Sequence, residues 1–99
     1  PLVIGDNVTI GHRAVVHACR VMDHCRIGIA AVVLNGAVIE EWAQVAAGSV
    51  VPPGKTVPGG WLVMGVPAKP VRKMSQDELD DMARNAADYF RLWNTNWPR

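Results

Sequence analysis

Large aliphatic residues recur along the first half of the chain at an almost constant spacing. They stand at Ile4, Ile10, Val15, Val21, Ile27, Val33, Ile39, Val45 and Val51, and every interval is six residues except the five from Ile10 to Val15. A helix repeats every 3.6 residues and a strand every two, so neither alone produces this period. A short strand followed by a corner does produce it. The pattern therefore predicts a β-solenoid of stacked coils over residues 1–57.

The residues between these aliphatics fit the same interpretation. Four positions after each of the first eight comes a small or slim side chain: Val8, Ala14, Cys19, Cys25, Ala31, Ala37, Ala43 and Ser49. We expect these side chains to point inward, which makes Cys19 and Cys25 reduced core thiols on sides of a coil too far apart for a disulfide. Gly, Asn, Asp and His take the corners, and His24 fills the corner place of Asn7. The tryptophans are expected to serve packing or an interface rather than to bind a cofactor: Trp42, Trp61, Trp93 and Trp97.

The repeat stops at VPPGKTVPGG, residues 51–60, where prolines and glycines interrupt regular pairing. The stretch 61–65 predicts one more short strand, and 66–74 a connector, so that 58–74 forms a terminating strand and connector. A helix is expected over 75–94, because Ser75 and Glu78 form a capping-box pattern. Its apolar stripe is expected to pack on a side of the coils: Leu79, Met82, Ala83, Ala86, Phe90 and Trp93.

Composition narrows the classes of function. The formal charge is +1 with 19% charged residues, which argues against nucleic acid as a partner. The longest apolar run, residues 27–34, is too short to span a bilayer, which argues against a membrane partner. Two cysteines without a targeting signal predict a reducing, cytoplasmic location. Because the chain begins with Pro1 and enters the repeat at once, we expect it to be a fragment.

His12 and His17 are the residues best suited to carry chemistry. In the repeat register both take the third place of successive hexads, at adjacent corners. Five extended residues span roughly 16 Å, whereas zinc holds imidazole nitrogens at about 2.0–2.1 Å. The two rings of one chain should therefore not share an ion. Either they are ordinary corner residues or they bind a metal between chains, and a closed ring of three chains would bring them together.

The segment IGDNVTIGHRAVVHACRV resembles the metal-binding segment of γ-class carbonic anhydrases, whose pattern is IGxxVTIGHxxxxHxC. The stretches VVPPGKTVPGG and MGVPAKPVRKMSQDEL, and the Tyr in NAADYF, continue the similarity. The resemblance implies a left-handed parallel β-helix of about three coils, three hexads to a coil, and a C-terminal α-helix. It also implies a homotrimer with His12 and His17 as ligands of zinc, or of iron or cobalt. The implied reaction is the reversible hydration of carbon dioxide to bicarbonate by metal-bound hydroxide, with Tyr89 near the metal as a weak catalytic candidate.

The resemblance also sets a limit on activity. The family uses three histidines, and the first lies upstream of the place where this chain starts. With His12 and His17 alone we expect weak metal binding and little hydration activity. Two alternatives stay open: a hexapeptide-repeat acyltransferase with a His as general base, which predicts a long projecting loop, and a non-catalytic trimeric scaffold.

Overall fold

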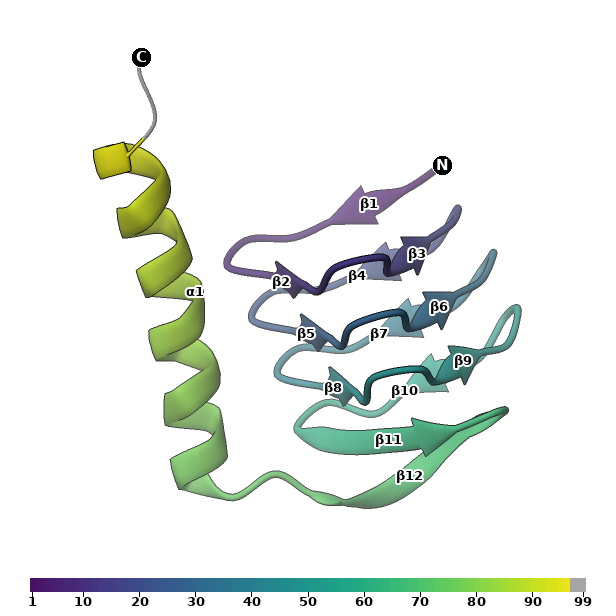
Figure 1. Cartoon of the computed structure of the whole chain (residues 1–99). Helices are drawn as coiled ribbons and strands as arrows, with labels where there is room; N and C mark the ends of the chain where they lie inside the picture. The colour runs from purple at the N-terminus through teal and green to yellow at the C-terminus, as the bar shows by residue number, and fades with distance from the viewer. Residues whose placement is uncertain (97–99) are drawn as a thin grey trace.

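The computed structural model describes the backbone of residues 1–96 and the side chains of residues 1–87. The first 57 residues form a solenoid of three complete coils, with α1 standing beside it along the stacking direction (Figure 1). Ten strands of two residues each build the coils: β1 Val3–Ile4, β2 Thr9–Ile10, β3 Val15–Val16, β4 Arg20–Val21, β5 Arg26–Ile27, β6 Val32–Val33, β7 Val38–Ile39, β8 Gln44–Val45, β9 Val50–Val51 and β10 Thr56–Val57.

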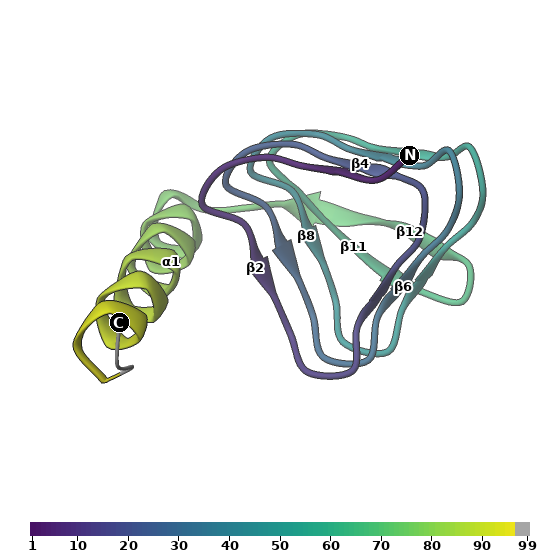
Figure 2. The ribbon, with the colours of Figure 1, turned by 90° about the horizontal axis from the view of Figure 1, so that it is seen from above.

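The strands stack into three parallel sheets, one for each side of a triangle. Their orders are β1-β4-β7-β10, β2-β5-β8 continued by β11 and β12, and β3-β6-β9. Viewed from the N-terminal end, the chain runs anticlockwise as it moves away from the viewer, which is a left-handed path (Figure 2). The predicted fold class, a left-handed parallel β-helix followed by one helix, is confirmed.

The predicted register was wrong at β3. Val15 pairs with Val32 and Val16 with Val33, and it is Val33 that is completely buried. Val16, not Val15, is therefore the inward residue. The five-residue interval lies between Val16 and Val21, at the corner that contains His17, because a corner can lose one residue while the strand pairing above and below it is kept.

The interior is a column of aliphatic and small side chains that interlock from coil to coil. Val21, Val33, Ile39 and Val45 are all 0% exposed. The column is open at its N-terminal end, because Ile4 is 41% exposed although it is paired in register with Val21. Cys19 and Cys25 are buried and free, as predicted.

Tight corners join the strands, and each places one residue in the left-handed region. The non-glycine residues there are Asn7, Arg13, Ala18, His24, Ala30 and Trp42. His24 thus takes the corner place of Asn7, as predicted. His12 and His17 do not adopt this conformation, so the corner backbone does not explain why imidazoles stand at either position.

Below the coils the chain reverses direction, which the sequence did not predict. β11, Trp61–Gly65, continues the second sheet by pairing with β8, and β12, Ala68–Lys73, pairs antiparallel with β11. The connector expected over 66–74 therefore contains a strand. Pro70 within it and the exposure of most of its side chains hide the usual alternation of a strand.

Helix α1 spans Gln76–Asn96, two residues beyond the expected end. The capping box is present: Glu78 N donates to Ser75 Oγ at 3.2 Å, and Ser75 N donates to Glu78 Oε1 at 2.9 Å. Met82 and Leu79 pack with Leu62 and Met74 against the second sheet. Ala83 is exposed, so within residues 76–87 the apolar stripe is narrower than expected, while the side chains of Phe90 and Trp93 lie outside the described residues. Among residues 1–96, no helix is long and apolar enough to cross a membrane.

Candidate metal-binding surface

The two candidate metal ligands lie at the two ends of one strand. His12 stands on the corner between β2 and β3, and His17 follows β3 directly, at the corner to β4. His17 N donates to Val33 O at 2.9 Å, the same bond that Gly11 N makes to Ile27 O at 2.8 Å. His17 is thus the first residue of its corner, whereas His12 is the second of the preceding corner. The prediction that both take the third place of a hexad was wrong for His17.

Both imidazoles are available to a ligand. Both residues are exposed, and among the side chains of residues 1–87 neither ring has a hydrogen-bond partner in the folded chain. Neutral imidazole is an established zinc ligand. Within that same part of the chain, no group of three His, Cys, Asp or Glu side chains could hold an ion. The donor chemistry fits a metal, but the described side chains of one chain do not assemble a complete site.

The face between the two histidines is apolar. On the outer side of β3-β6-β9, Val15, Val32 and Val50 stand in register one below the next. Val15 is 48% exposed, and the other two are half-buried. The corresponding outer positions on the second sheet are Thr9, Arg26 and Gln44. One side of the triangle therefore carries a valine stripe with a histidine corner on either edge.

A polar hollow lies beside His12, between the second sheet and α1. Its volume is about 210 Å³, and its lining includes Thr9, Arg26, Gln44 and Asn85. Arg26 is held in place, because its guanidinium donates to Gln44 Oε1 at 3.2 Å and meets Asp81 Oδ2 of α1 at 3.4 Å. The sequence pattern alone did not indicate these residues. What three of them share is a polar side chain at the outer position of three stacked strands, and this repetition can be recognised only once the length of a coil is known.

The other sequence candidates lie away from this surface. Cys25 Sγ donates to Glu40 O at 3.0 Å, and burial raises the pKa of this thiol to about 11, so it stays protonated and unsuited to bind metal. His24 stacks on Trp42 with ring centroids 4.3 Å apart, as an aromatic corner pair. Tyr89 belongs to α1, but its side chain lies outside the described residues, so its role remains a prediction.

Comparisons with known proteins agree with this geometry. Residues 1–17 and 20–53, more than half of the chain, match the family described as the hexapeptide repeat of succinyl-transferase. The chain is 44% identical over 92 residues to γ carbonic anhydrase 2, mitochondrial, of Arabidopsis thaliana, covering 93% of this chain and 33% of that protein. It is 41% identical over 95 residues to a probable carbonic anhydrase of Methanocaldococcus jannaschii, covering 96% and 60%.

A solved structure of a putative acetyltransferase from Bacillus cereus has the same fold. Its TM-score is 0.85 at 31% identity, over 91% of this chain and 58% of that one. The chain thus spans about a third of the length of the plant relative and less than two thirds of the other two proteins. The six-residue period, the three-sided solenoid and the family match together show that the chain belongs to the hexapeptide-repeat family, in which it resembles the γ-class carbonic anhydrases.

Proposed function

We propose that this chain forms a homotrimer with metal sites between chains and that it serves the γ-carbonic-anhydrase reaction, the reversible hydration of carbon dioxide. The observation that carries the proposal is the valine stripe bounded by His12 and His17. When three chains turn Val15, Val32 and Val50 toward a common axis, the apolar stripe leaves water. The His12 corner of one chain then meets the His17 corner of the next.

The two histidines and the polar hollow would have separate roles. His12 and His17 of neighbouring chains would hold a divalent ion such as zinc, which supplies a water molecule whose pKa is lowered toward about 7. Arg26, fixed by Gln44 and paired with Asp81, lines the hollow beside His12 and would offer its remaining N–H donors to bicarbonate. Because two imidazoles are fewer protein ligands than catalytic zinc sites normally have, we expect weak binding and little hydration activity from residues 1–99 alone.

Zinc titration of single-histidine variants tests the ligand assignment. We expect His12→Ala and His17→Ala each to remove calorimetrically detectable zinc binding. His24→Asn is the matched control, since it removes the third histidine while keeping a residue that tolerates the left-handed corner. If His24→Asn were as damaging as the other two changes, the assignment would be wrong.

Mixing variants tests whether the site lies between chains. Trimers assembled from equal amounts of His12→Ala and His17→Ala chains would recover about a quarter of the intact sites, because random assembly pairs an intact His12 with an intact neighbouring His17 that often. A site within one chain would recover none. Val32→Glu should abolish both assembly and zinc binding by placing a charge in the valine stripe.

The alternative function is acyl transfer, which the similarity to a putative acetyltransferase favours. Against it, the segment from Ile4 to Val51 has only tight corners and no projecting loop to help form an acyl-donor site. Coenzyme A binding by calorimetry separates the two functions. A trimer that binds neither zinc nor coenzyme A would be the non-catalytic scaffold. For the location we propose the cytoplasm, since Cys19 and Cys25 are both free thiols.

A further inference from the structure

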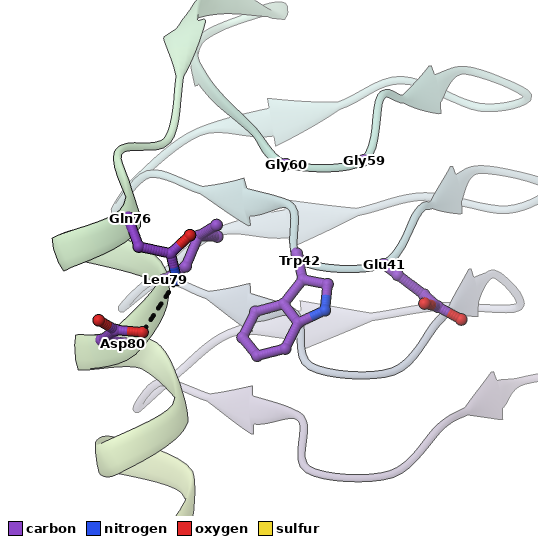
Figure 3. Close-up of a pocket in the computed structure, with 7 residues that line it drawn as sticks. All are labelled: Glu41, Trp42, Gly59, Gly60, Gln76, Leu79 and Asp80. Carbon is purple, nitrogen blue, oxygen red and sulfur yellow. Dashed lines mark hydrogen bonds between the residues drawn. The ribbon is translucent and has the colours of Figure 1, made fainter.

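A second hollow lies on a different corner of the solenoid, away from His12 and His17. Its volume is about 460 Å³, in the range of small-molecule sites, and it is lined by Glu41, Trp42, Gly59, Gly60, Gln76, Leu79 and Asp80. Figure 3 shows the indole of Trp42 between Glu41 on one side and Leu79 and Asp80 of α1 on the other. The hollow is open because the Gly59–Gly60 corner carries no side chains. A Cβ added at Gly60 would meet nothing within 4 Å.

Trp42 occupies its corner at a conformational cost. Its φ is +64°, in the left-handed region that bulky side chains rarely adopt. The equivalent corner above it in the stack uses His24, and the one below uses Gly60. One face of the indole stacks on the imidazole of His24 at 4.3 Å. A molecule in the hollow can therefore meet only the other face of the ring or its edge.

The charges around the hollow are of one sign. Glu41 and Asp80 are carboxylates, both exposed, and none of the seven lining residues is basic. Gln76 Nε2 donates to Asp80 Oδ1 at 3.0 Å, which orients that carboxylate and leaves its second oxygen without this bond (Figure 3). An indole face with carboxylates beside it attracts an organic cation, through the ring quadrupole and through the charges together.

From these contacts we propose that this hollow binds a small organic cation of the alkylammonium or quaternary ammonium class. A divalent metal fits less well, because Trp42 and Leu79 supply apolar surface and, among residues 1–87, no three acidic, His or Cys side chains are grouped to coordinate an ion. An alkylated ammonium uses both kinds of surface, since its methyl groups contact the indole and leucine while its charge faces the carboxylates. This site is independent of the proposed metal-binding function.

The probe for this site is choline, followed by NMR at the indole N–H of Trp42 and the amide of Gly60. The control ligand is the uncharged isostere of choline, in which carbon replaces the nitrogen. We expect choline to shift both signals with roughly millimolar affinity, and the isostere to bind at least several-fold more weakly. Equal binding of the two molecules would overturn the proposal, because it would show that the charge is not recognised.

Variants test the contributions of the indole ring and of the two carboxylates separately. Trp42→Asn keeps a residue that tolerates the corner and removes the ring, so choline binding should weaken by about 3- to 30-fold. Glu41→Gln and Asp80→Asn should each weaken binding by about two- to five-fold. Asp77→Asn is the matched control, because Asp77 is an exposed acid of the same helix outside the hollow. Unchanged binding in Trp42→Asn, or an equal loss in Asp77→Asn, would contradict the proposal.

A third change covers the case in which Trp42→Asn does not fold. Gly60→Asn adds a side chain at the corner that lines the hollow while leaving Trp42 and both carboxylates in place, and Asn tolerates the φ of +73° at this position. Choline binding should weaken in this variant, because the new side chain narrows the hollow, while the circular dichroism spectrum stays that of the parent chain. Choline binding that is unchanged by this side chain would place the ligand elsewhere.

Discussion

Truncating matched isoleucines at two levels of the solenoid tests how its stability is built. Ile4 and Ile39 both point inward on the first sheet, one coil above and one coil below Val21. Ile39 is 0% exposed, enclosed by coils on both sides, whereas Ile4 is 41% exposed at the open end. The same change to Ala thus removes the same atoms from two environments that differ mainly in enclosure.

The expected costs follow from burial. Ile→Ala removes three carbons at about 0.8 kcal/mol each, which gives about 2.4 kcal/mol for a fully buried side chain. At Ile39 the lost atoms leave an enclosed cavity, so the free energy of unfolding should fall by about 3–4 kcal/mol. At Ile4, with 41% of the residue already exposed, the loss should be about 1.4 kcal/mol. No enclosed cavity forms there, and an end coil can fray separately.

The assay is urea unfolding followed by circular dichroism, with both variants and the parent chain at two protein concentrations. The two concentrations separate folding from any contribution of assembly. A difference of about 2 kcal/mol between the variants, with unchanged m-values, is the expected result. Equal costs would refute the argument, because they would mean that the N-terminal end of the column is covered as completely as its centre.

Three further outcomes follow from contacts at single residues. Gly28→Ala should unfold the coils, because its Cβ would stand 2.5 Å from a backbone nitrogen of the next coil. Gly48→Ala should lower the free energy of unfolding by only about 1 kcal/mol, because its Cβ would meet nothing within 4 Å and only the φ of +69° is unfavourable. Thermal melting compares the two variants. Arg72 and the capping hydrogen bonds lower the pKa of Glu78 from 4.5 to about 2, so the stabilisation they give is complete above pH 4.5 and is lost as the pH falls toward 2. Helicity should fall in that window, and Glu78→Gln should remove that part of the pH dependence. Cys25 should resist a thiol reagent at pH 8 until the chain is unfolded, because burial raises its pKa to about 11; rapid labelling of the folded chain would show that this thiol is accessible.

Much of the fold could be predicted from the sequence because a solenoid repeats one local rule. Each coil buries one aliphatic and one small residue per side, so the spacing of Ile27, Val33 and Ile39 alone indicates a strand and a corner. The inward thiols and the corner place of His24 follow from the same rule. The capping box at Ser75 is equally local, since its two hydrogen bonds join residues three apart.

The sequence could not locate the shortened corner. Val15 and Val16 are identical side chains, and either could continue the pattern with one interval of five residues. The choice is made by the backbone hydrogen bonds to the next coil, which place Val16 over Val33. That choice moves His17 to the start of its corner, so the position of a proposed ligand was decided by pairing between residues 17 apart.

What the sequence by itself determined was the period, the inward residues and the pair of histidines that resembles a metal-binding segment. Only the tertiary structure decided which residues of different coils and elements lie side by side on the surface. Stacking turns single outer valines into a stripe between His12 and His17, folds β12 back on β11, and sets Trp42 beside α1 over an empty glycine corner. The physical reason is that the six-residue repeat is satisfied inside each coil, whereas the valine stripe and the stacked corners of Trp42 and Gly60 bring together residues 17 or 18 apart, whose relative positions depend on the length of every corner between them. The pairing of β12 with β11 is more local, but it lies outside the repeat and so outside its rule.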